Sequence, residues 1–256
     1  MLKGRIACLA LFLAACSLDG GAGARLEAEP TRSTGGDTGA NPGASSDADL
    51  AAMIARIVQD VDQSWAGDFR RRNKPYQAAH VVTFSERAPN PCARAGLSLA
   101  AQCQDPGAVY VDLDFQRALR QRYGKDAGAS QAYTLAHAMG HHVQKVLGLD
   151  REAARLVANR PVAAHSIDLQ LELQADCLAG VWTRVSKSGA LPREQVEEAL
   201  KQASEVGAQR RLDRDRDQPA AYETYTYAIP RRRVYWFAKG FGTAKVEDCD
   251  PFAATE

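Results

Sequence analysis

Apolar residues recur at intervals of three and four along residues 50–65, the spacing that lines one face of an α-helix. The same criterion predicts further helices over residues 114–123, 130–148, 167–188 and 192–206. Two shorter segments, 81–84 and 109–113, are β-branched or alternate between apolar and polar residues, which predicts two strands of a small sheet. The pattern therefore predicts an α+β domain that is mostly helical.

Local signals place the ends of these helices. The four later helices each end at or just before a glycine, and these are Gly124, Gly148, Gly189 and Gly207. Glycine is common just beyond a helix because it tolerates the left-handed backbone found there. Ser166 can cap the helix over 167–188, and Pro192 can open the helix that follows it.

Residues 1–15 have the character of a secretory signal. Lys3 and Arg5 precede an apolar run over residues 6–15 that is too short to span a membrane as a permanent helix. The run ends in Leu13-Ala14-Ala15-Cys16, which resembles the lipobox of bacterial lipoproteins. We expect residues 1–15 to be removed and Cys16 to become the lipid-modified first residue. The alternative is an ordinary signal peptide in which Cys16 is incidental.

The predicted anchor indicates where the protein resides. Ser17 follows Cys16, so the aspartate that retains lipoproteins in the inner membrane is absent. We therefore expect a lipoprotein of the bacterial cell envelope, on the outer membrane and facing the periplasm or the cell exterior. Membrane lipid would be its partner through the acyl chains of Cys16, which contribute about 0.8 kcal/mol per buried methylene.

Composition separates a tether from a domain and narrows the class of protein. Residues 16–48 are mostly small and polar and cannot offset the entropy of ordering, so we interpret them as a flexible linker. Residues 49–256 are assigned to one folded domain. The whole chain has 32 Lys and Arg against 31 Asp and Glu, and beyond the leader it has no apolar run near the ~20 residues that span a bilayer. A nucleic-acid binder and a polytopic membrane protein are therefore excluded.

Cysteine usage indicates an oxidising compartment. Beyond the leader and Cys16 the chain contains Cys92, Cys103, Cys177 and Cys249. An even number in an exported chain favours two disulfides, and of the three connectivities we favour Cys92 with Cys103 and Cys177 with Cys249. A zinc site built from all four thiolates is the alternative, although no CxxC spacing supports it.

Histidines and acids on two predicted helices suggest a metal site. His137 and His141 are four residues apart, so their side chains share one helix face and can bind one Zn²⁺. Such a pair alone is weak support, because most pairs of this kind cap helices or lie at the surface. Glu172 on the next helix can be a third ligand, and Asp176, one turn further, can accept the free ring N–H of a ligating histidine. A solvated acidic stripe is the alternative, but surrounding leucines indicate partial burial.

These residues carry a resemblance to a known family. The segment Ala136-His137-Ala138-Met139-Gly140-His141-His142-Val143-Gln144, followed by Glu172-Leu173-Gln174-Ala175-Asp176-Cys177, resembles the bacterial putative neutral zinc metallopeptidase family. The similarity covers nearly the whole domain. It implies a zincin-like fold of the gluzincin type, with zinc held by two motif histidines and a downstream glutamate, here His137, His141 and Glu172. It also implies both disulfides.

One departure from the family pattern concerns catalysis. The family motif is His-Glu-x-x-His, and this chain has Ala138 in place of the glutamate. In zinc peptidases that glutamate takes a proton from the attacking water and returns it to the leaving amine. A methyl group can do neither, and a general acid or base contributes about 10²–10⁴ in rate. We therefore assign no catalytic residue and predict a zinc-binding pseudopeptidase.

A second departure lies near the C-terminus. Where the family has Phe-Thr-His-Gly, this chain reads Tyr225-Thr226-Tyr227-Ala228, so Tyr227 replaces a histidine on the oxyanion side. The phenol of Tyr227 can still donate a hydrogen bond. The stretch over 207–212 also departs from the family pattern. Several changes around one cleft favour natural drift of a pseudoenzyme.

Two arginine-rich segments are interpreted as surface features. Arginines and aspartates alternate over 210–217, which suggests a solvated helix end or loop. Arg231, Arg232 and Arg233 are expected in an exposed turn before a packed aromatic helix, where lipid phosphates or an acidic partner are an alternative contact.

Three functions follow from the sequence. The first is the zinc-binding pseudopeptidase, which would accept a peptide or protein ligand in the inherited cleft. The second is a working hydrolase in which another carboxylate, or the substrate itself, supplies the base. The third is a structural envelope lipoprotein without metal.

Overall fold

The computed structural model describes residues 42–85, 108–214, 230–250 and 252. The predicted signal peptide and most of the predicted linker lie outside these ranges. So do Cys16, Cys92, Cys103 and Tyr227. No helix among the described residues has the length and apolar character needed to cross a membrane.

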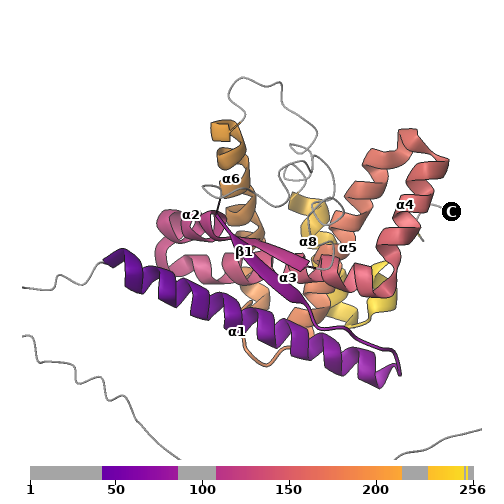
Figure 1. The fold of residues 1–256 in the computed structure, drawn as a ribbon, viewed down its shortest axis with the longest axis horizontal. Coiled ribbons are helices and arrows are strands. Elements are labelled where there is room, and N and C mark those ends of the chain that lie inside the picture. Colours follow the sequence, from indigo (N-terminus) through magenta and orange to yellow (C-terminus); the bar gives the residue numbers. More distant parts are fainter. Residues whose placement is uncertain (1–41, 86–107, 215–229, 251, 253–256) are drawn as a thin grey trace, which may run out of the picture. The chain divides into compact units, whose positions relative to one another are not determined.

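The described domain is mostly helical with one pair of strands (Figure 1). Its helices are α1 (Pro42–Arg71), α2 (Leu113–Tyr123), α3 (Gly128–Leu147), α4 (Leu149–Asn159), α5 (Ala164–Val185), α6 (Val196–Arg214) and α8 (Pro230–Thr243). Short 3₁₀ helices cover Gly124–Ala127, Pro161–Ala163, Arg193–Gln195 and Val246–Cys249. The strands are β1 (His80–Phe84) and β2 (Ala108–Asp112). The predicted α+β, mostly helical class is confirmed.

The two strands pair in parallel, with Val81 opposite Val109 and Phe84 opposite Asp112. Both predicted strands are thereby confirmed to within one residue at each end. The connection between them, residues 86–107, lies outside the described ranges. Asp112 ends β2 and caps α2, because its carboxylate accepts hydrogen bonds from the backbone N–H groups of Asp114 and Phe115.

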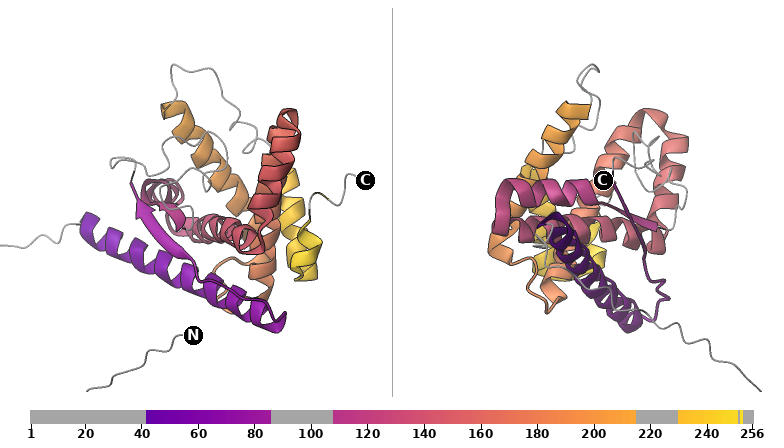
Figure 2. Two further views of the ribbon diagram at one scale, coloured as in Figure 1. Left: turned by 45° about the vertical axis from the view of Figure 1, so that its right-hand side comes forward. Right: turned by 60° about the vertical axis from the view of Figure 1, so that its left-hand side comes forward.

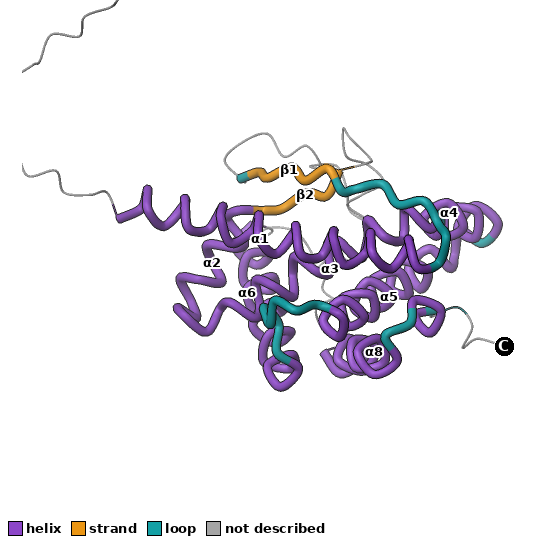
Figure 3. Tube along the Cα trace, turned by 90° about the horizontal axis from the view of Figure 1, so that it is seen from below, coloured by secondary structure: helices purple, strands orange, loops and turns teal. Residues whose placement is uncertain are grey.

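Helices α3 and α5 form the centre of the domain. α3 contacts α5, α1, α6 and β2, while α8 packs along the opposite side of α5. Figure 3 shows this succession from the strands through α3 and α5 to α8, and Figure 2 shows α8 alongside α5. The largest fully buried side chains come from several of these helices and include Trp65, Phe69, Met139, Trp182 and Phe237.

Glycines allow α5 and α8 to approach closely. A Cβ atom at Gly240 of α8 would overlap the carbonyl oxygen of Cys177 on α5, and one at Gly180 would overlap the carbonyl oxygen of Phe237. The two helices therefore touch through their backbones at these points. This contact fixes the start of α8 against the acidic face of α5.

The structure extends the first helix beyond its predicted start. α1 begins at Pro42, so residues 42–48 of the predicted linker are helical. Proline fits the first helical position because its missing N–H would be unpaired there. Asp47 forms an ion pair with Arg117 of α2, with Nε and Oδ1 2.9 Å apart. The linker prediction considered composition alone and missed this contact.

The start of α5 and the end of α6 also differ from prediction. α5 starts at Ala164, and the Ser166 hydroxyl donates to the Ala163 carbonyl, so Ser166 does not cap the helix. α6 continues through Gly207 to Arg214, because Val206 packs into a buried cluster with Leu119. Tertiary packing outweighs the small helix cost of glycine there.

Helix α4 was not predicted at all. Its single buried residue, Ala153, packs with Ile167 and Leu171 of α5. Leu149, Ala153, Leu156 and Val157 have the spacing of one helix face, so the sequence carried a signal for α4 that the prediction overlooked.

Candidate metal centre

Helix α3 positions the two histidines of the candidate site. His137 and His141 lie on one face, while Leu135, Met139 and Val143 anchor the opposite face in the core. Gly140 lies between the histidines, where a Cβ atom would be 2.8 Å from the carbonyl oxygen of Ala175. The glycine therefore lets α3 approach α5 closely, which brings the histidines against the acids of α5.

Three side chains converge at this crossing. The Nε2 atom of His137 lies 3.1 Å from Oε2 of Glu172, and Nε2 of His141 lies 3.3 Å from Oε1 of Glu172. The two Nε2 atoms are 3.2 Å apart. These three residues form a group whose ligand atoms all lie within 4.8 Å of one another. The side chain of Glu172 is 29% exposed, so the group is accessible to solvent.

Asp176 fixes the orientation of His137. Its side chain is fully buried, and its Oδ1 lies 2.9 Å from Nδ1 of His137. The hydroxyl of Tyr133 donates to the same oxygen at 2.5 Å. Arg233 donates from Nε to Oδ2 at 2.7 Å and from Nη2 to Oδ1 at 3.1 Å. Because an ionised carboxylate only accepts, Nδ1 of His137 carries a proton, and in the neutral ring Nε2 presents its lone pair.

A chain of glutamines fixes the orientation of His141. The side-chain amide of Gln144 donates to the carbonyl of Leu171 at 2.7 Å and to Oε1 of Gln174 at 3.0 Å. Its Oε1 therefore accepts from Nδ1 of His141, at 2.8 Å. Gln174 in turn donates to the carbonyl of Cys249, at 2.8 Å. As with His137, the Nε2 atom of His141 is left with a free lone pair.

The converging atoms need a positive charge among them. When both rings are neutral, two nitrogen lone pairs and a carboxylate meet at one point, and such acceptors repel unless a cation or a proton intervenes. Imidazole nitrogen and carboxylate oxygen are the ligands that Zn²⁺ takes in proteins. The donor set of His137, His141 and Glu172 therefore fits a zinc ion.

The pKa shifts reflect the same requirement for positive charge between the acids. Burial lowers the pKa of His137, but the charge of Asp176 and hydrogen bonds with Asp176 and Glu172 outweigh it and raise the pKa to about 9. Burial raises the pKa of Glu172, but His141 and His137 hold it well below its usual range. Burial likewise raises the pKa of Asp176, and Arg233 and His137 bring it below its ordinary value. Both acids are therefore ionised at neutral pH.

Arg233, Tyr133 and Gln144 have roles at this site that the sequence did not predict. The predicted exposed turn is wrong, because Arg233 lies in the first turn of α8 and its side chain is 8% exposed. Arg231 and Arg232 are exposed as expected. The available signal was the aromatic run that follows, Val234-Tyr235-Trp236-Phe237, whose buried members Trp236 and Phe237 turn Arg233 inward at helical spacing.

The disulfide between Cys177 and Cys249 is present, as predicted. Cys177 directly follows Asp176 on α5, and Cys249 ends the 3₁₀ helix Val246–Cys249. The bridge therefore holds the end of the chain against the helix that carries the acids.

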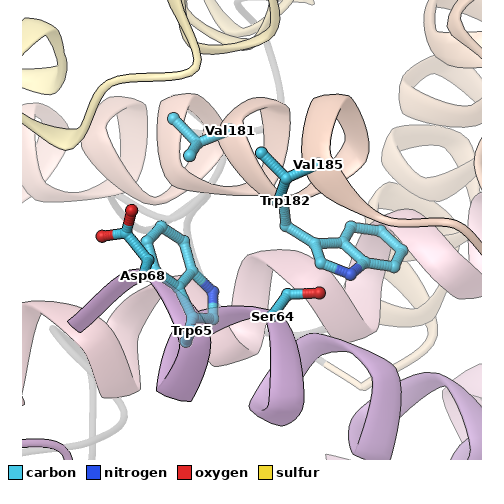
Figure 4. A pocket seen from close by; sticks show the side chains of 6 residues that line it. All are labelled: Ser64, Trp65, Asp68, Val181, Trp182 and Val185. Carbon is cyan, nitrogen blue, oxygen red and sulfur yellow. The ribbon is translucent and has the colours of Figure 1, made fainter. Parts of the chain in front are cut away.

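Ala138 lies beside the histidines and is partly buried. It packs against the hydrophobic core and offers no polar atom beyond its backbone. A separate shallow crevice lies between α1 and α5, lined by Ser64, Trp65, Asp68, Val181, Trp182 and Val185 (Figure 4). None of its lining residues belongs to the His137, His141 and Glu172 group.

The chain is similar to known bacterial proteins. The chain is 31% identical over 208 residues to Uncharacterized protein YpfJ of Escherichia coli strain K12, covering 80% of this chain and 72% of that protein. It is 30% identical over 194 residues to Uncharacterized protein Rv2575 of Mycobacterium tuberculosis strain H37Rv, covering 71% and 64% respectively. No solved structure matches. The family model described as "Putative neutral zinc metallopeptidase" matches residues 6–252, and the chain therefore belongs to that family.

Proposed function

We propose that this protein is a zinc-binding pseudopeptidase of the cell envelope. His137 and His141 would hold the ion through their Nε2 atoms and Glu172 through its carboxylate. The observation that carries the proposal is the convergence of two imidazole Nε2 atoms and a carboxylate, 3.1–3.3 Å apart, with the Nδ1 atom of each ring already engaged by Asp176 or Gln144. When bound, zinc supplies Lewis acidity, which polarises a carbonyl group and makes water more acidic.

The other polar residues of the site orient the ligands. Asp176 holds the Nδ1 proton of His137, and Gln144 holds that of His141. Such partners fix the tautomer of each ligand and increase its basicity. The ligands are thus held in fixed orientations, and the side chains of His141 and Glu172 are partly exposed, so solvent can reach the site.

The missing proton acceptor limits the chemistry. Ala138 occupies the position of the glutamate in the His-Glu-x-x-His motif that the chain resembles. Without a carboxylate there, no side chain of the motif takes a proton from an attacking water or returns it to a leaving amine. We propose that the domain binds a peptide or protein segment beside the metal and does not turn it over.

Anchoring belongs to the same proposal. Cys16 would carry acyl chains and residues 17–41 would act as a tether to the outer membrane, facing the periplasm or the cell exterior. The lipobox-like Leu13-Ala14-Ala15-Cys16 supports this placement. Labelling cells with a radioactive fatty acid would test it, since Cys16→Ser should abolish incorporation.

Metal content and activity, measured together, test the proposed function. We expect about one zinc per purified full-length chain and no hydrolysis of a general peptide substrate such as casein. Ala138→Glu should restore turnover by at least about 10²-fold over background, because it returns the general base. Glu172→Ala should lose the zinc. Glu197→Ala, the same change at an exposed helical position, should keep it.

Each alternative function predicts a different result. Chelator-sensitive turnover by the unaltered protein would establish a hydrolase that uses another base and would refute the pseudopeptidase. Absence of zinc after purification in zinc-containing buffer would refute the metal site and favour a structural lipoprotein.

A further inference from the structure

A buried arginine lies behind the candidate metal group. The side chain of Arg233 is 8% exposed, and its guanidinium donates two hydrogen bonds to the fully buried carboxylate of Asp176. Its Nη2 atom is 4.0 Å from Oε2 of Glu172 and 3.2 Å from Nδ1 of His137. The guanidinium also lies over the ring of Tyr133, with its carbon 5.8 Å from the ring centroid.

The position of Arg233 allows its positive charge to balance the negative charges of two nearby acids. Asp176 and Glu172 place two negative charges within one small, largely buried cluster, and a buried charge without a partner is strongly destabilising. A bound metal ion would neutralise them, but the two negative charges are also present when no metal is bound. Arg233 supplies a permanent positive charge that does not depend on bound metal. The packing of α8 on α5 places this charge at the site.

We infer that Arg233 is a built-in counter-cation, a positioning residue that keeps His137, Glu172 and Asp176 assembled when no metal is bound. The inference rests on the proposed zinc site and deepens it. Arg233 and the metal neutralise the same two acids, so each matters more when the other is missing. A residue that only packs would contribute equally in both states.

Thermal unfolding with and without metal tests this difference. Chelator-stripped full-length protein and Arg233→Met would each be melted alone and with excess Zn²⁺. Without metal, Arg233→Met should lower Tm on the order of 10 °C, the effect of breaking a buried ion pair in a domain of this size. With zinc the loss should be clearly smaller, so the zinc-induced rise in Tm should be larger in the variant than in the unaltered protein.

Arg232→Met is the matched control. Arg232 is the neighbouring arginine on the same helix and is exposed, so the same substitution there should leave Tm and the zinc-induced shift unchanged. If zinc raises the Tm of the unaltered protein, equal losses for Arg233→Met with and without zinc would overturn the inference, because they would indicate a purely structural role. An unchanged Tm in Arg233→Met without metal would also overturn it.

A double variant tests the counter-cation role of Arg233 if Arg233→Met fails to fold. Adding Asp176→Asn removes the acid that Arg233 neutralises, so Arg233→Met with Asp176→Asn should be more stable without metal than Arg233→Met alone. A double variant no more stable than the single one would refute the counter-cation. This comparison needs no metal, whereas a zinc shift missing from every protein, including the unaltered one, would refute the proposed zinc site alone.

Discussion

At the scale of single residues, the candidate site depends on partners that never touch the metal position. Gln144 is held by the Leu171 carbonyl and by Gln174, which makes its Oε1 a fixed acceptor for Nδ1 of His141. A ring that can rotate or change tautomer presents its Nε2 lone pair less often. The affinity of the site for zinc therefore depends on the side-chain amide of Gln144 as well as on His141.

Gln144→Leu should therefore weaken zinc binding by about 10–100-fold, the usual effect of losing such a partner. Competition with a chromogenic chelator would measure it. Gln131→Leu is the control, since Gln131 is also a buried glutamine of α3 but donates to the carbonyl of Gln116. Gln131→Leu should lower stability and leave affinity intact, and an equal loss of affinity in both variants would contradict the assigned role.

At the scale of helices, the site is made where α5 crosses α3 on one side and α8 on the other. α3 brings the histidines and α8 brings Arg233, and both crossings depend on glycine. The backbone contact between Gly240 and Cys177 fixes how far along α5 the start of α8 lies. Moving these helices apart would separate Arg233 from Asp176.

We predict that Gly240→Ala destabilises the domain by about 1–3 kcal/mol or more, because its methyl group would force α8 away from α5. Gly242→Ala, two residues along the same helix, meets nothing within 4 Å and should be neutral or stabilising by up to about 1 kcal/mol. Urea unfolding of both variants would measure the difference. Similar free energies of unfolding for the two would show that the close approach is not required.

At the scale of the whole molecule, the elements that the sequence predicted correctly are those with a strong local periodicity of apolar residues. The helix carrying His137 and His141 and the strand at 109–113 were predicted because their apolar spacing is strong. Arg233 was not, because its partner Asp176 is distant in sequence and only the packing of α8 on α5 brings them together. α6 extends beyond its predicted end for a similar reason. Val206 is buried against Leu119 of α2, and a local sequence pattern does not reveal this contact.

The disulfide connects α5 to a segment near the C-terminal end of the described chain. Cys177 and Cys249 are 72 residues apart in sequence, and closing a loop of that length contributes about 4 kcal/mol on a chain-entropy estimate. The Cys249 carbonyl also accepts the hydrogen bond from Gln174 that begins the chain leading to His141. Loss of the bridge should therefore affect both stability and metal binding.

We predict that replacing both Cys177 and Cys249 with alanine lowers the free energy of unfolding by about 4 kcal/mol and also weakens zinc binding. Paired substitution is preferable to a reductant, which would also reduce any bridge between Cys92 and Cys103. Urea unfolding and chelator competition would be measured on the same preparation. Lower stability with unchanged zinc affinity would mean that the glutamines hold His141 without help from the bridge, because the packing of α5 would then suffice to fix the Cys249 carbonyl.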